Sequence, residues 1–428
     1  MTIIDALKAK DSTFLSLVKK ISTEEKVELT SLIDDIIKGR TVVLWNIKSK
    51  VKPSAVGRNL RTKVNANIGT SPDLVDIKLE LKKLNAAVSA KTDTVMDLST
   101  GGDIDFIRKK ILENSPVPVG TVPIYQVVCE TLKKGRKVKD ITKEQIFEVI
   151  EKHAEDGIDF ITVHCGVTKK NLEILRKNRR VCGIVSRGGA FLAEWIIKNN
   201  KENPLYEDFD ELLKIAKKYN LTLSLGDGLR PGALADANDK AQIAELKTLA
   251  ELSKIANKEG VQVMIEGPGH MPMDTIEAHV KLEKKLTGGK PFYLLGPLVT
   301  DIAAGYDHIN SAIGAAIAAM AGADLICYVT PAEHLRLPTP QDVYEGVIAA
   351  RIAAHAADIV KRKKYNVVDI DLAMSKSRKA LNWRLQQKYA IDPIKFQLEH
   401  KKIESKTKKV CSMCGPYCAM RESTKIGI

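Results

Sequence analysis

The chain has 428 residues, enough for one large barrel with additions or for two to three ordinary domains. Its hydrophobic content of 44% supports a substantial buried core, and its formal charge of +14 favours small anionic partners such as phosphates. Aromatic residues make up only 5% of the chain, too few for extensive base stacking, so we expect no nucleic-acid partner.

The N-terminal residues MTIIDALKAKDS carry charges and lack the apolar core of a secretory signal. We therefore expect a cytoplasmic protein with reduced thiols. The most apolar run, 313–329, is rich in Ala and Gly and contains Asp324. Its pattern predicts a small-residue helix followed by a short strand, so we expect no membrane span.

Residues 1–60 form a mixed, basic N-terminal segment. Its pattern predicts amphipathic helices over 4–20 and 23–38, followed by a short strand at TVVLWNI. No catalytic pattern stands out in this part of the chain.

Residues 61–365 alternate short β-rich runs with amphipathic helices. This alternation predicts an α/β fold with a parallel sheet closed as a (β/α)8 barrel, and a doubly wound open sheet is the alternative. The sequence offers nine candidate strands, whereas the barrel needs eight. We expect the first candidate, the run that ends in NANIG, to be an extra strand or a loop. The runs end in NANIG, MDLSTGG, VPIYQ, ITVHCGV, GIVSRGG, LSLGDGLR, VMIEGPGH, YLLGPLVTD and ICYVTPAEH. The helices expected between them include 143–155, 170–178, 189–199, 208–219, 239–258, 274–286, 308–321 and 340–360.

Residues 366–428 form the C-terminal region, with helices expected over 369–400 and a solvated linker over 401–409. The region ends in CSMCGPYC, which places Cys411, Cys414 and Cys418 within eight residues. Three thiolates are one ligand short of a closed zinc site, whereas a cluster iron without a protein thiolate can hold a cofactor. We favour a [4Fe–4S] cluster, with a zinc knuckle or no metal as the alternatives.

Two histidines each follow a predicted strand, His270 in EGPGH and His334 in TPAEH. In a barrel both would reach the same mouth, where two imidazoles plus water and substrate make an open metal site. The alternative is that each histidine is simply hydrogen-bonded.

Two glycine-rich turns, SRGG and GDGLRPG, could hold an anion through helix amides and through Arg187 and Arg230. Either could equally be a turn that requires positive φ angles. The carboxylates at predicted strand ends could act as general acids or bases, or cap the following helices. They are Asp97, Asp227, Glu266 and Asp301.

Together, VNANIGTS, MDLSTGGDI, SPVPVGTVPIYQ, SRGG, GDGLRPG, EGPGHMPMD, GPLVTDIAAGYDHI, TPAEHL and the terminal cysteine loop resemble the phosphomethylpyrimidine synthase family. The resemblance runs in order from about residue 62 to the end. These are atypical radical S-adenosylmethionine (SAM) enzymes that make the pyrimidine of thiamine.

The resemblance implies a homodimer of (β/α)8 barrels with exchanged C-terminal cluster regions. It implies 5-aminoimidazole ribonucleotide as the substrate and an external one-electron reductant. Reductive cleavage of SAM would give methionine and a 5′-deoxyadenosyl radical. That radical would start the rearrangement to 4-amino-5-hydroxymethyl-2-methylpyrimidine phosphate, with formate and carbon monoxide released and 5′-deoxyadenosine formed.

Carried over position by position, the resemblance assigns three groups of residues. The cluster falls on Cys411, Cys414 and Cys418, and a second metal, zinc or another divalent ion, falls on His270 and His334. Asp227 and Glu266 would hold ring or hydroxyl groups and shuttle protons. The substrate contacts fall on Asn67, Met96, Tyr125, His164, Ser186, Arg187, Gly188, Asp227, Gly228, Leu229, Arg230, Glu266 and Tyr293.

One spacing departs from the family pattern. Its long-chain members place four residues between the second and third cysteines, whereas here three separate Cys414 from Cys418. The sequence therefore leaves open a sister activity, 5-hydroxybenzimidazole synthase, which uses the same substrate. A zinc-only barrel lyase or hydrolase is the rival of another class.

Overall fold

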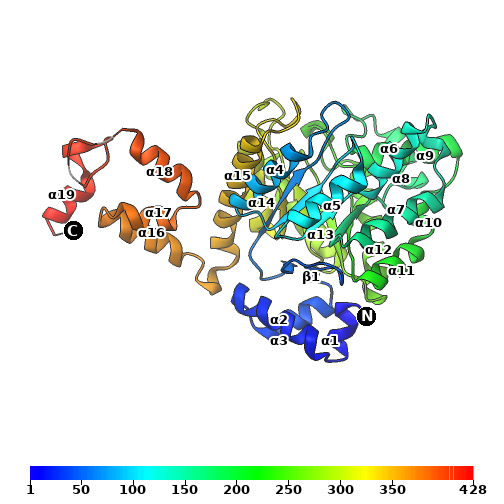
Figure 1. The fold of residues 1–428 in the computed structure, drawn as a ribbon, viewed down its shortest axis with the longest axis horizontal. Helices are drawn as coiled ribbons and strands as arrows, with labels where there is room; N and C mark the ends of the chain where they lie inside the picture. The colour runs from blue at the N-terminus through cyan, green and yellow to red at the C-terminus, as the bar shows by residue number, and fades with distance from the viewer. Residues whose placement is uncertain (404, 408, 428) are drawn as a thin grey trace. The chain divides into compact units, whose positions relative to one another are not determined.

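The structure is a computed structural model that describes residues 1–403, 405–407 and 409–427. The chain divides into two compact units, Met1–Lys361 and Arg362–Ile428. Figure 1 shows the chain from its N-terminal helices through the barrel to the C-terminal helices.

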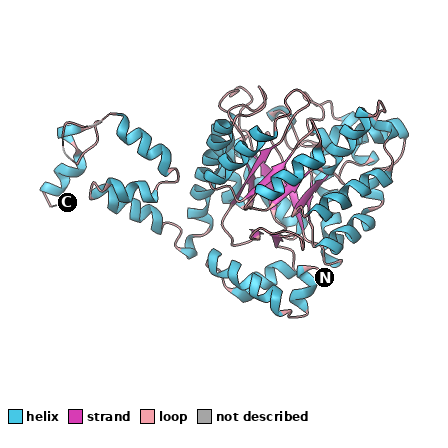
Figure 2. Ribbon diagram, in the orientation of Figure 1, coloured by secondary structure: helices cyan, strands magenta, loops and turns pink. Residues whose placement is uncertain are grey.

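The larger unit is built on eight parallel strands that close into a barrel in the order β10-β3-β4-β5-β6-β7-β8-β9. This closure confirms the predicted (β/α)8 fold and excludes the open sheet. Figure 2 shows the strands enclosed by helices. The strands are β3 (Lys63–Ile68), β4 (Thr94–Asp97), β5 (Val119–Thr121), β6 (Phe160–Val163), β7 (Thr222–Leu225), β8 (Val263–Gly267), β9 (Phe292–Leu295) and β10 (Leu325–Cys327).

The extra strand candidate was wrongly identified. NANIG belongs to β3, a barrel strand, whereas the run ending in SRGG is a loop that leads into α9 (Arg187–Asn199). The reason lies in hydrogen bonding, because Asp236 accepts the N–H groups of Val181 and Cys182 as the chain enters this loop. The segment therefore has a side-chain partner in place of a neighbouring strand.

The third run also ends differently from the prediction. Strand β5 stops at Thr121, and Pro123 begins helix α6 (Pro123–Lys133). Proline suits the first position of a helix because its missing N–H has no partner there. Tyr125 therefore lies on the first turn of a helix and not at the end of a strand.

Helices surround the barrel, and every one predicted from sequence between 143 and 360 is present. Helix α7 illustrates the local signals, since Thr142 and Gln145 form a capping box and Gly157 ends the helix at φ 102°. The helices are α4 (Ile77–Ser89), α5 (Ile104–Asn114), α7 (Lys143–Asp156), α8 (Lys169–Lys177), α10 (Pro204–Glu207), α11 (Phe209–Tyr219), α12 (Lys240–Lys258), α13 (Met273–Thr287), α14 (Asp307–Ala321) and α15 (Pro340–Lys361), with 3-10 turns η1 (Val138–Asp140) and η2 (Leu234–Asp236).

The N-terminal segment has three helices where two were predicted: α1 (Ile3–Lys8), α2 (Ser12–Glu25) and α3 (Leu29–Ile37). The expected helix 4–20 is broken because Asp11 caps α2 by accepting from the N–H groups of Thr13 and Phe14.

A two-stranded antiparallel sheet follows these helices, formed by β1 (Thr41–Leu44) and β2 (Ser54–Gly57). Gln262 joins this sheet to the barrel. Its Oε1 accepts from the N–H of Val43 at 2.7 Å, and its Nε2 donates to the carbonyl of Val43 at 3.0 Å. The N-terminal segment is thereby fastened to the barrel.

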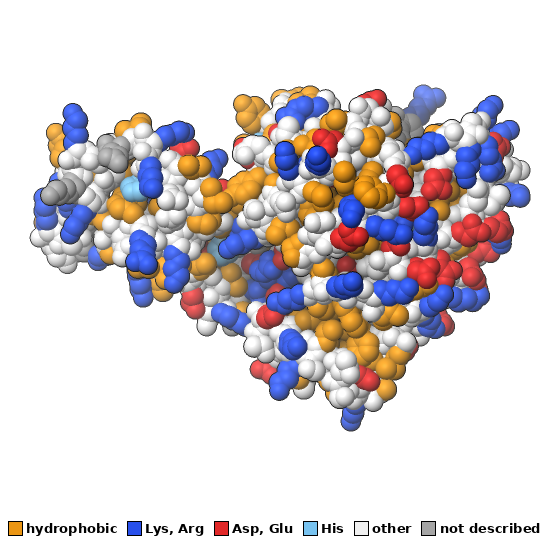
Figure 3. Space-filling model, in the orientation of Figure 1, with side chains coloured by type: hydrophobic (Ala, Val, Ile, Leu, Met, Phe, Trp, Pro, Cys, Tyr) orange, Lys and Arg blue, Asp and Glu red, His pale blue; other side chains and the backbone are white. Residues whose placement is uncertain are grey.

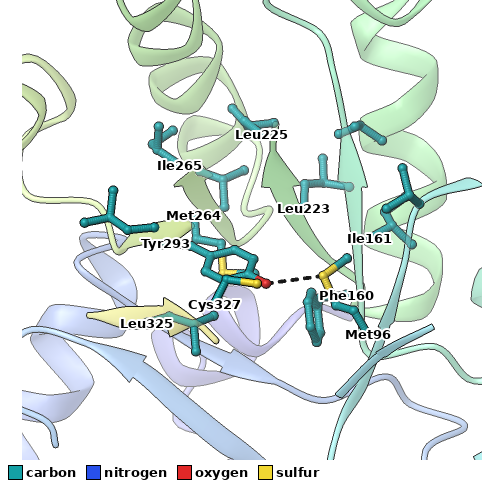
Figure 4. Close-up of a cluster of buried hydrophobic side chains, with 14 of the residues drawn as sticks. Met96, Phe160, Ile161, Leu223, Leu225, Met264, Ile265, Tyr293, Leu325 and Cys327 are labelled. Carbon is teal, nitrogen blue, oxygen red and sulfur yellow. Dashed lines mark hydrogen bonds between the residues drawn. The ribbon is translucent and has the colours of Figure 1, made fainter. Parts of the chain in front are cut away.

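The barrel interior is filled by large side chains at some levels and by polar ones at others. Figure 4 shows Phe160 and Met96 among the buried residues, with the Tyr293 hydroxyl donating to Met96 Sδ at 3.4 Å. Gly120 makes room for this packing, since a Cβ there would lie 2.3 Å from the Phe160 ring. The barrel is therefore a packed core and not a pore.

The second unit is helical, as expected for 369–400. It comprises η3 (Lys363–Tyr365), α16 (Asp369–Lys379), α17 (Trp383–Tyr389), α18 (Pro393–Lys402), η4 (Gly415–Tyr417) and α19 (Ala419–Lys425). Of the predicted linker 401–409, residues 404 and 408 lie outside the described residues.

Charged side chains cover much of the surface. On the face drawn in Figure 3, Lys and Arg are interspersed with Asp and Glu around the barrel helices. Among the described residues, no helix combines the length and the apolar character needed to cross a membrane.

Candidate active site

A cavity of about 90 Å³ lies at the carboxyl ends of the barrel strands. Eight of the residues that the resemblance assigns to substrate line it, although they come from positions spread over more than two hundred residues. The lining residues are Asn67, Met96, Leu98, Val122, Tyr125, Thr162, His164, Asp227, Arg230, Glu266, Gly267, Tyr293, Leu295 and Cys327. The barrel brings them together because parallel strands all end at the same rim.

Glu266, near the end of β8, is held by side chains of the two preceding strands, β6 and β7. Its Oε1 accepts from the hydroxyls of Thr162 and Ser224, both at 2.7 Å. Burial raises the pKa of Glu266, although these two hydrogen bonds and the charge of Arg230 oppose the rise. The carboxyl is thus fixed in direction and biased towards carrying a proton.

Asp227 and Arg230 form the only ion pair among the described residues that line the cavity, with Nη1 of Arg230 3.3 Å from Asp227 Oδ1. Burial raises the pKa of Asp227 well above its usual range, and the carboxylates Glu266 and Glu245 add to the rise. The other oxygen, Oδ2, is buried and has no hydrogen-bond partner in the structure. An unpaired buried oxygen in a cavity is suited to a ligand.

His164, directly after β6, is completely enclosed. Burial, helped by the charge of Arg230, lowers the pKa of its imidazole to about 3. Its Nδ1 is buried without a partner in the described structure. The ring is therefore neutral at physiological pH and has a nitrogen free for a ligand.

Tyr293 and Asn67 belong to a polar network inside the barrel. The amide nitrogen of Asn65 donates to the Tyr293 hydroxyl at 2.8 Å, and that of Asn67 donates to Cys327 Sγ at 3.0 Å. Burial raises the pKa of the Cys327 thiol to about 11, so it stays protonated. The polar side chains of Asn65, Asn67, Tyr293 and Cys327 are therefore uncharged and hydrogen-bonded to one another.

Sequence reasoning missed four polar residues of this site: Asn65, Thr162, Ser224 and Cys327. Each lies on a strand, and two of them, Asn65 and Thr162, come two positions before a predicted contact residue. Side chains two apart on a strand share a face, so that alternation was an available signal for these two. The pairing of Thr162 and Ser224 with Glu266 depends on strands adjacent only in the folded barrel.

The Ser186–Gly188 turn does not line the inner cavity. Ser186 is buried and caps α9 by accepting from the N–H of Gly189. The Arg187 guanidinium lies 4.9 Å from the Tyr125 ring centroid, and it lines an adjoining cavity of about 340 Å³. The two cavities share Asn67, Leu98 and Leu295.

Two predicted contacts, Gly228 and Leu229, lie behind the inner cavity. The N–H of Leu229 donates to Glu245 Oε2 at 2.7 Å, and its side chain is buried. Neither residue lines the cavity, so both support the Asp227–Arg230 turn from behind.

The predicted histidine pair is brought together. The rings of His270 and His334 lie 5.6 Å apart, between centroids. The Nδ1 of His270 lies 2.9 Å from Asp301, and the Nδ1 of His334 lies 3.2 Å from Asp307. A carboxylate on one ring nitrogen is the usual support for a histidine whose other nitrogen binds metal. The geometry suits a divalent ion held by two protein ligands.

The three clustered cysteines lie on a compact turn. The N–H of Gly415 donates to the carbonyl of Cys411 at 3.1 Å, and that of Tyr417 donates to the carbonyl of Cys414 at 3.0 Å. All three thiols are free. No group of three or more metal-binding side chains is assembled within the described part of the chain. The donor set itself, three thiols on one turn, is the chemistry that iron–sulfur clusters use.

A protein-family model described as the Radical SAM ThiC family matches residues 4–425. The chain is 59% identical over 403 residues to a phosphomethylpyrimidine synthase of Thermoanaerobacter sp. (strain X514), which covers 94% of this chain and 93% of that protein. It is 52% identical to the enzyme of that name from Thermodesulfovibrio yellowstonii, over 97% and 98% of the two chains. The identity to the Methanocaldococcus jannaschii protein of that name is 50%, over 98% of each chain.

Proposed function

The chain belongs to the radical SAM ThiC family, and on that premise we propose that it converts 5-aminoimidazole ribonucleotide into 4-amino-5-hydroxymethyl-2-methylpyrimidine phosphate. The observation that carries the proposal is the convergence of eight of the thirteen expected substrate contacts on one cavity. Formate and carbon monoxide would be released, and SAM would be consumed to methionine and 5′-deoxyadenosine.

The phosphate end of the nucleotide is assigned to the cations and to the start of α9. Arg187 and Arg230 carry the positive charge, and the first amides of a helix have no partner within it. Ser186 fixes that helix start by its capping bond to Gly189. The phosphate would therefore replace water at donors that are already oriented.

The ring and ribose are assigned to the buried polar atoms of the inner cavity. Asp227 Oδ2 and His164 Nδ1 have no partner in the described structure, so each gains a hydrogen bond when a ligand enters. Glu266 has a raised pKa and is held by Thr162 and Ser224, which suits it to give or take a proton at the ring. Tyr293 and Asn67, which also line this cavity, would orient the ring by hydrogen bonds.

The cysteine turn is assigned to a [4Fe–4S] cluster, held by Cys411, Cys414 and Cys418. The cluster, with an electron from an external reductant, supplies reductive cleavage of SAM and hence the 5′-deoxyadenosyl radical. The family name supports SAM chemistry.

The histidine pair is assigned to a divalent metal, with zinc as the first candidate. Two imidazoles leave coordination positions open for water and substrate, unlike a closed structural site. Asp301 and Asp307 would keep both rings in the required tautomer.

A homodimer with exchanged C-terminal regions is part of the proposal. The three cysteines lie in the compact unit Arg362–Ile428, while the nucleotide cavity lies in Met1–Lys361. Light scattering under anoxia should give twice the chain mass of 47.1 kDa.

The test is anaerobic reconstitution with iron and sulfide, followed by incubation with SAM, reductant and 5-aminoimidazole ribonucleotide. Mass analysis should detect the pyrimidine phosphate together with 5′-deoxyadenosine. A hydroxybenzimidazole product would assign the sister activity instead, which the shortened Cys414–Cys418 spacing leaves open. Turnover in air without SAM would support a zinc-only lyase and refute the proposal.

A further inference from the structure

The two turns assigned to the nucleotide lie against each other, backbone to backbone. A Cβ on Gly189 would lie 2.1 Å from the carbonyl oxygen of Gly228. A Cβ on Gly232 would lie 2.2 Å from the side chain of Val185. The start of α9 and the Asp227–Arg230 turn are therefore one packed assembly, and whatever fixes the second turn also sets its distance from the first.

Arg180, which neither the motifs nor the resemblance singles out, joins these two segments. Its Nη2 donates to the carbonyl of Leu229 at 2.5 Å, and its Nη1 donates to the carbonyl of Arg230 at 3.2 Å. The same Nη1 reaches the carbonyl of Gly183 at 3.3 Å, three residues before Ser186. One guanidinium thus holds backbone carbonyls of both ligand-facing segments.

The guanidinium is itself anchored from the other side. Asp239, the N-cap of α12, accepts from Nε at 2.6 Å and from Nη2 at 2.8 Å. Only 1% of the Arg180 side chain is exposed. A planar fork paired with a carboxylate in two places has a fixed orientation, so the carbonyls that it contacts are fixed as well.

We propose that Arg180 is a positioning residue that sets the backbone of Arg230, so that the Arg230 side chain meets the nucleotide at the correct place. The inference deepens the proposed function, on which it rests. Arg180 does not line either cavity, so it acts on the nucleotide only through the backbone that it holds, and Arg230 is the residue of that backbone that lines the inner cavity.

The experiment measures binding of 5-aminoimidazole ribonucleotide to the full-length protein by anaerobic calorimetry, without SAM, so that no turnover occurs. Arg180→Met removes the hydrogen bonds from the guanidinium to the carbonyls of Leu229 and Arg230, so the backbone of Arg230 is no longer fixed. The dissociation constant should therefore rise about tenfold or more. Arg180→Lys keeps a charge for Asp239 but cannot hold all three carbonyls, and should give an intermediate value.

Arg108→Met is the matched control. Arg108 is another fully buried arginine, paired with Asp105 and Asp156 on the outer helices and absent from both cavities. Its replacement should lower the melting temperature while changing the dissociation constant less than about twofold. The control therefore shows whether a general loss of stability by itself raises the dissociation constant of the nucleotide.

A double-mutant cycle separates positioning from mere structural support. If Arg180 acts through Arg230, then in an Arg230→Gln background the further change Arg180→Met should alter binding less than about twofold. Equal fold-losses in both backgrounds, or unchanged binding of Arg180→Met alone, would overturn the inference and leave the proposed function standing. A wild-type protein that does not bind the nucleotide would overturn both.

Discussion

Some of the buried polar atoms without partners lie in or beside the candidate site. Among the described residues they include His164 Nδ1, Asp227 Oδ2 and Glu245 Oε1. Leaving such an atom unpaired costs about 1–3 kcal/mol, a cost that a ligand with matching groups removes. Of these three residues, His164 and Asp227 line the inner cavity and are thus suited to bind substrate, whereas Glu245 lies behind it.

Glu245 gives a prediction about pH and stability. Burial raises its pKa from 4.5 to about 8, although the hydrogen bond from Leu229 opposes the rise. The folded state binds this proton more tightly than the unfolded state, so the stabilising contribution is complete below pH 4.5 and is lost as pH rises through 8.

Glu245→Gln removes this titration while keeping an oxygen that accepts from Leu229. Between pH 5.5 and 8.5, the melting temperature of the wild-type protein should fall about 2–4 °C more than that of the variant, measured by anaerobic calorimetry. Parallel pH profiles for the two proteins would show that Glu245 does not carry the raised pKa.

The histidine pair gives a prediction about metal content. His270→Ala should abolish binding of one equivalent of zinc, because one remaining imidazole is a weak site. Asp301→Asn should weaken zinc binding by about 10- to 100-fold, since the ring loses its carboxylate partner. Equilibrium dialysis with atomic emission detection measures both. Undiminished zinc in His270→Ala would place the metal elsewhere.

At the scale of elements, the start of helix α9 packs closely against the site residue His164. Its first turn is pressed against the barrel rim, where a Cβ on Gly188 would lie 2.3 Å from Cε1 of His164. Only glycine allows the helix start and the imidazole to lie this close. The Gly-rich turn is therefore required by packing, whatever ligand it holds.

Gly188→Ala should move the start of α9 away from His164 and weaken nucleotide binding by about tenfold or more, since one misplaced turn loses several donors. Ala190→Gly is the control in the same helix. It costs about 1 kcal/mol of helix stability but places no atom against His164. Anaerobic calorimetry measures the two affinities. Equal affinities in both variants would mean that the close approach has no bearing on binding.

At the scale of the whole molecule, nucleotide binding and cluster binding are assigned to different compact units. The nucleotide cavity lies in the larger unit and the clustered cysteines lie in the smaller one. A substitution that abolishes cluster binding in the smaller unit should therefore leave nucleotide binding in the larger unit measurable, and the reverse should also hold.

Cys414→Ala should abolish acid-labile sulfide and 5′-deoxyadenosine formation after anaerobic reconstitution, while nucleotide binding stays within about twofold of wild type. Cys182→Ala, which removes an exposed thiol of the larger unit, should retain the cluster. Retained SAM cleavage in Cys414→Ala would refute the assignment of the cluster.

Exchange of C-terminal regions can be tested by mixing two inactive variants. Cys414→Ala has an intact cavity, and His164→Ala has an intact cysteine turn. If the cysteines of one protomer serve the cavity of its partner, each heterodimer contains one complete site of its two. Random co-expression makes about half of the dimers heterodimers, so the mixture should regain about a quarter of wild-type activity. Without exchange, every site keeps one defect, and the mixture stays inactive.

The sequence by itself determined the barrel, most of its helices and the list of chemical groups at its mouth. Strands and helices follow from local periodicity, turns and caps, which neighbouring residues encode. Two of its errors were local ones in which a nearby side chain changed the outcome, as when Asp11 capped a new helix or Pro123 began α6 two residues before Tyr125.

Only the tertiary structure decided which runs become barrel strands and which polar groups meet. NANIG pairs with strands on both sides, while the chain before Ser186 is held by Asp236, more than fifty residues away. The link from Arg180 to Leu229 and the link from Thr162 to Glu266 likewise join distant segments. No local pattern encodes such contacts, because they arise from the closure of the barrel and the hydrogen bonds that buried groups must find.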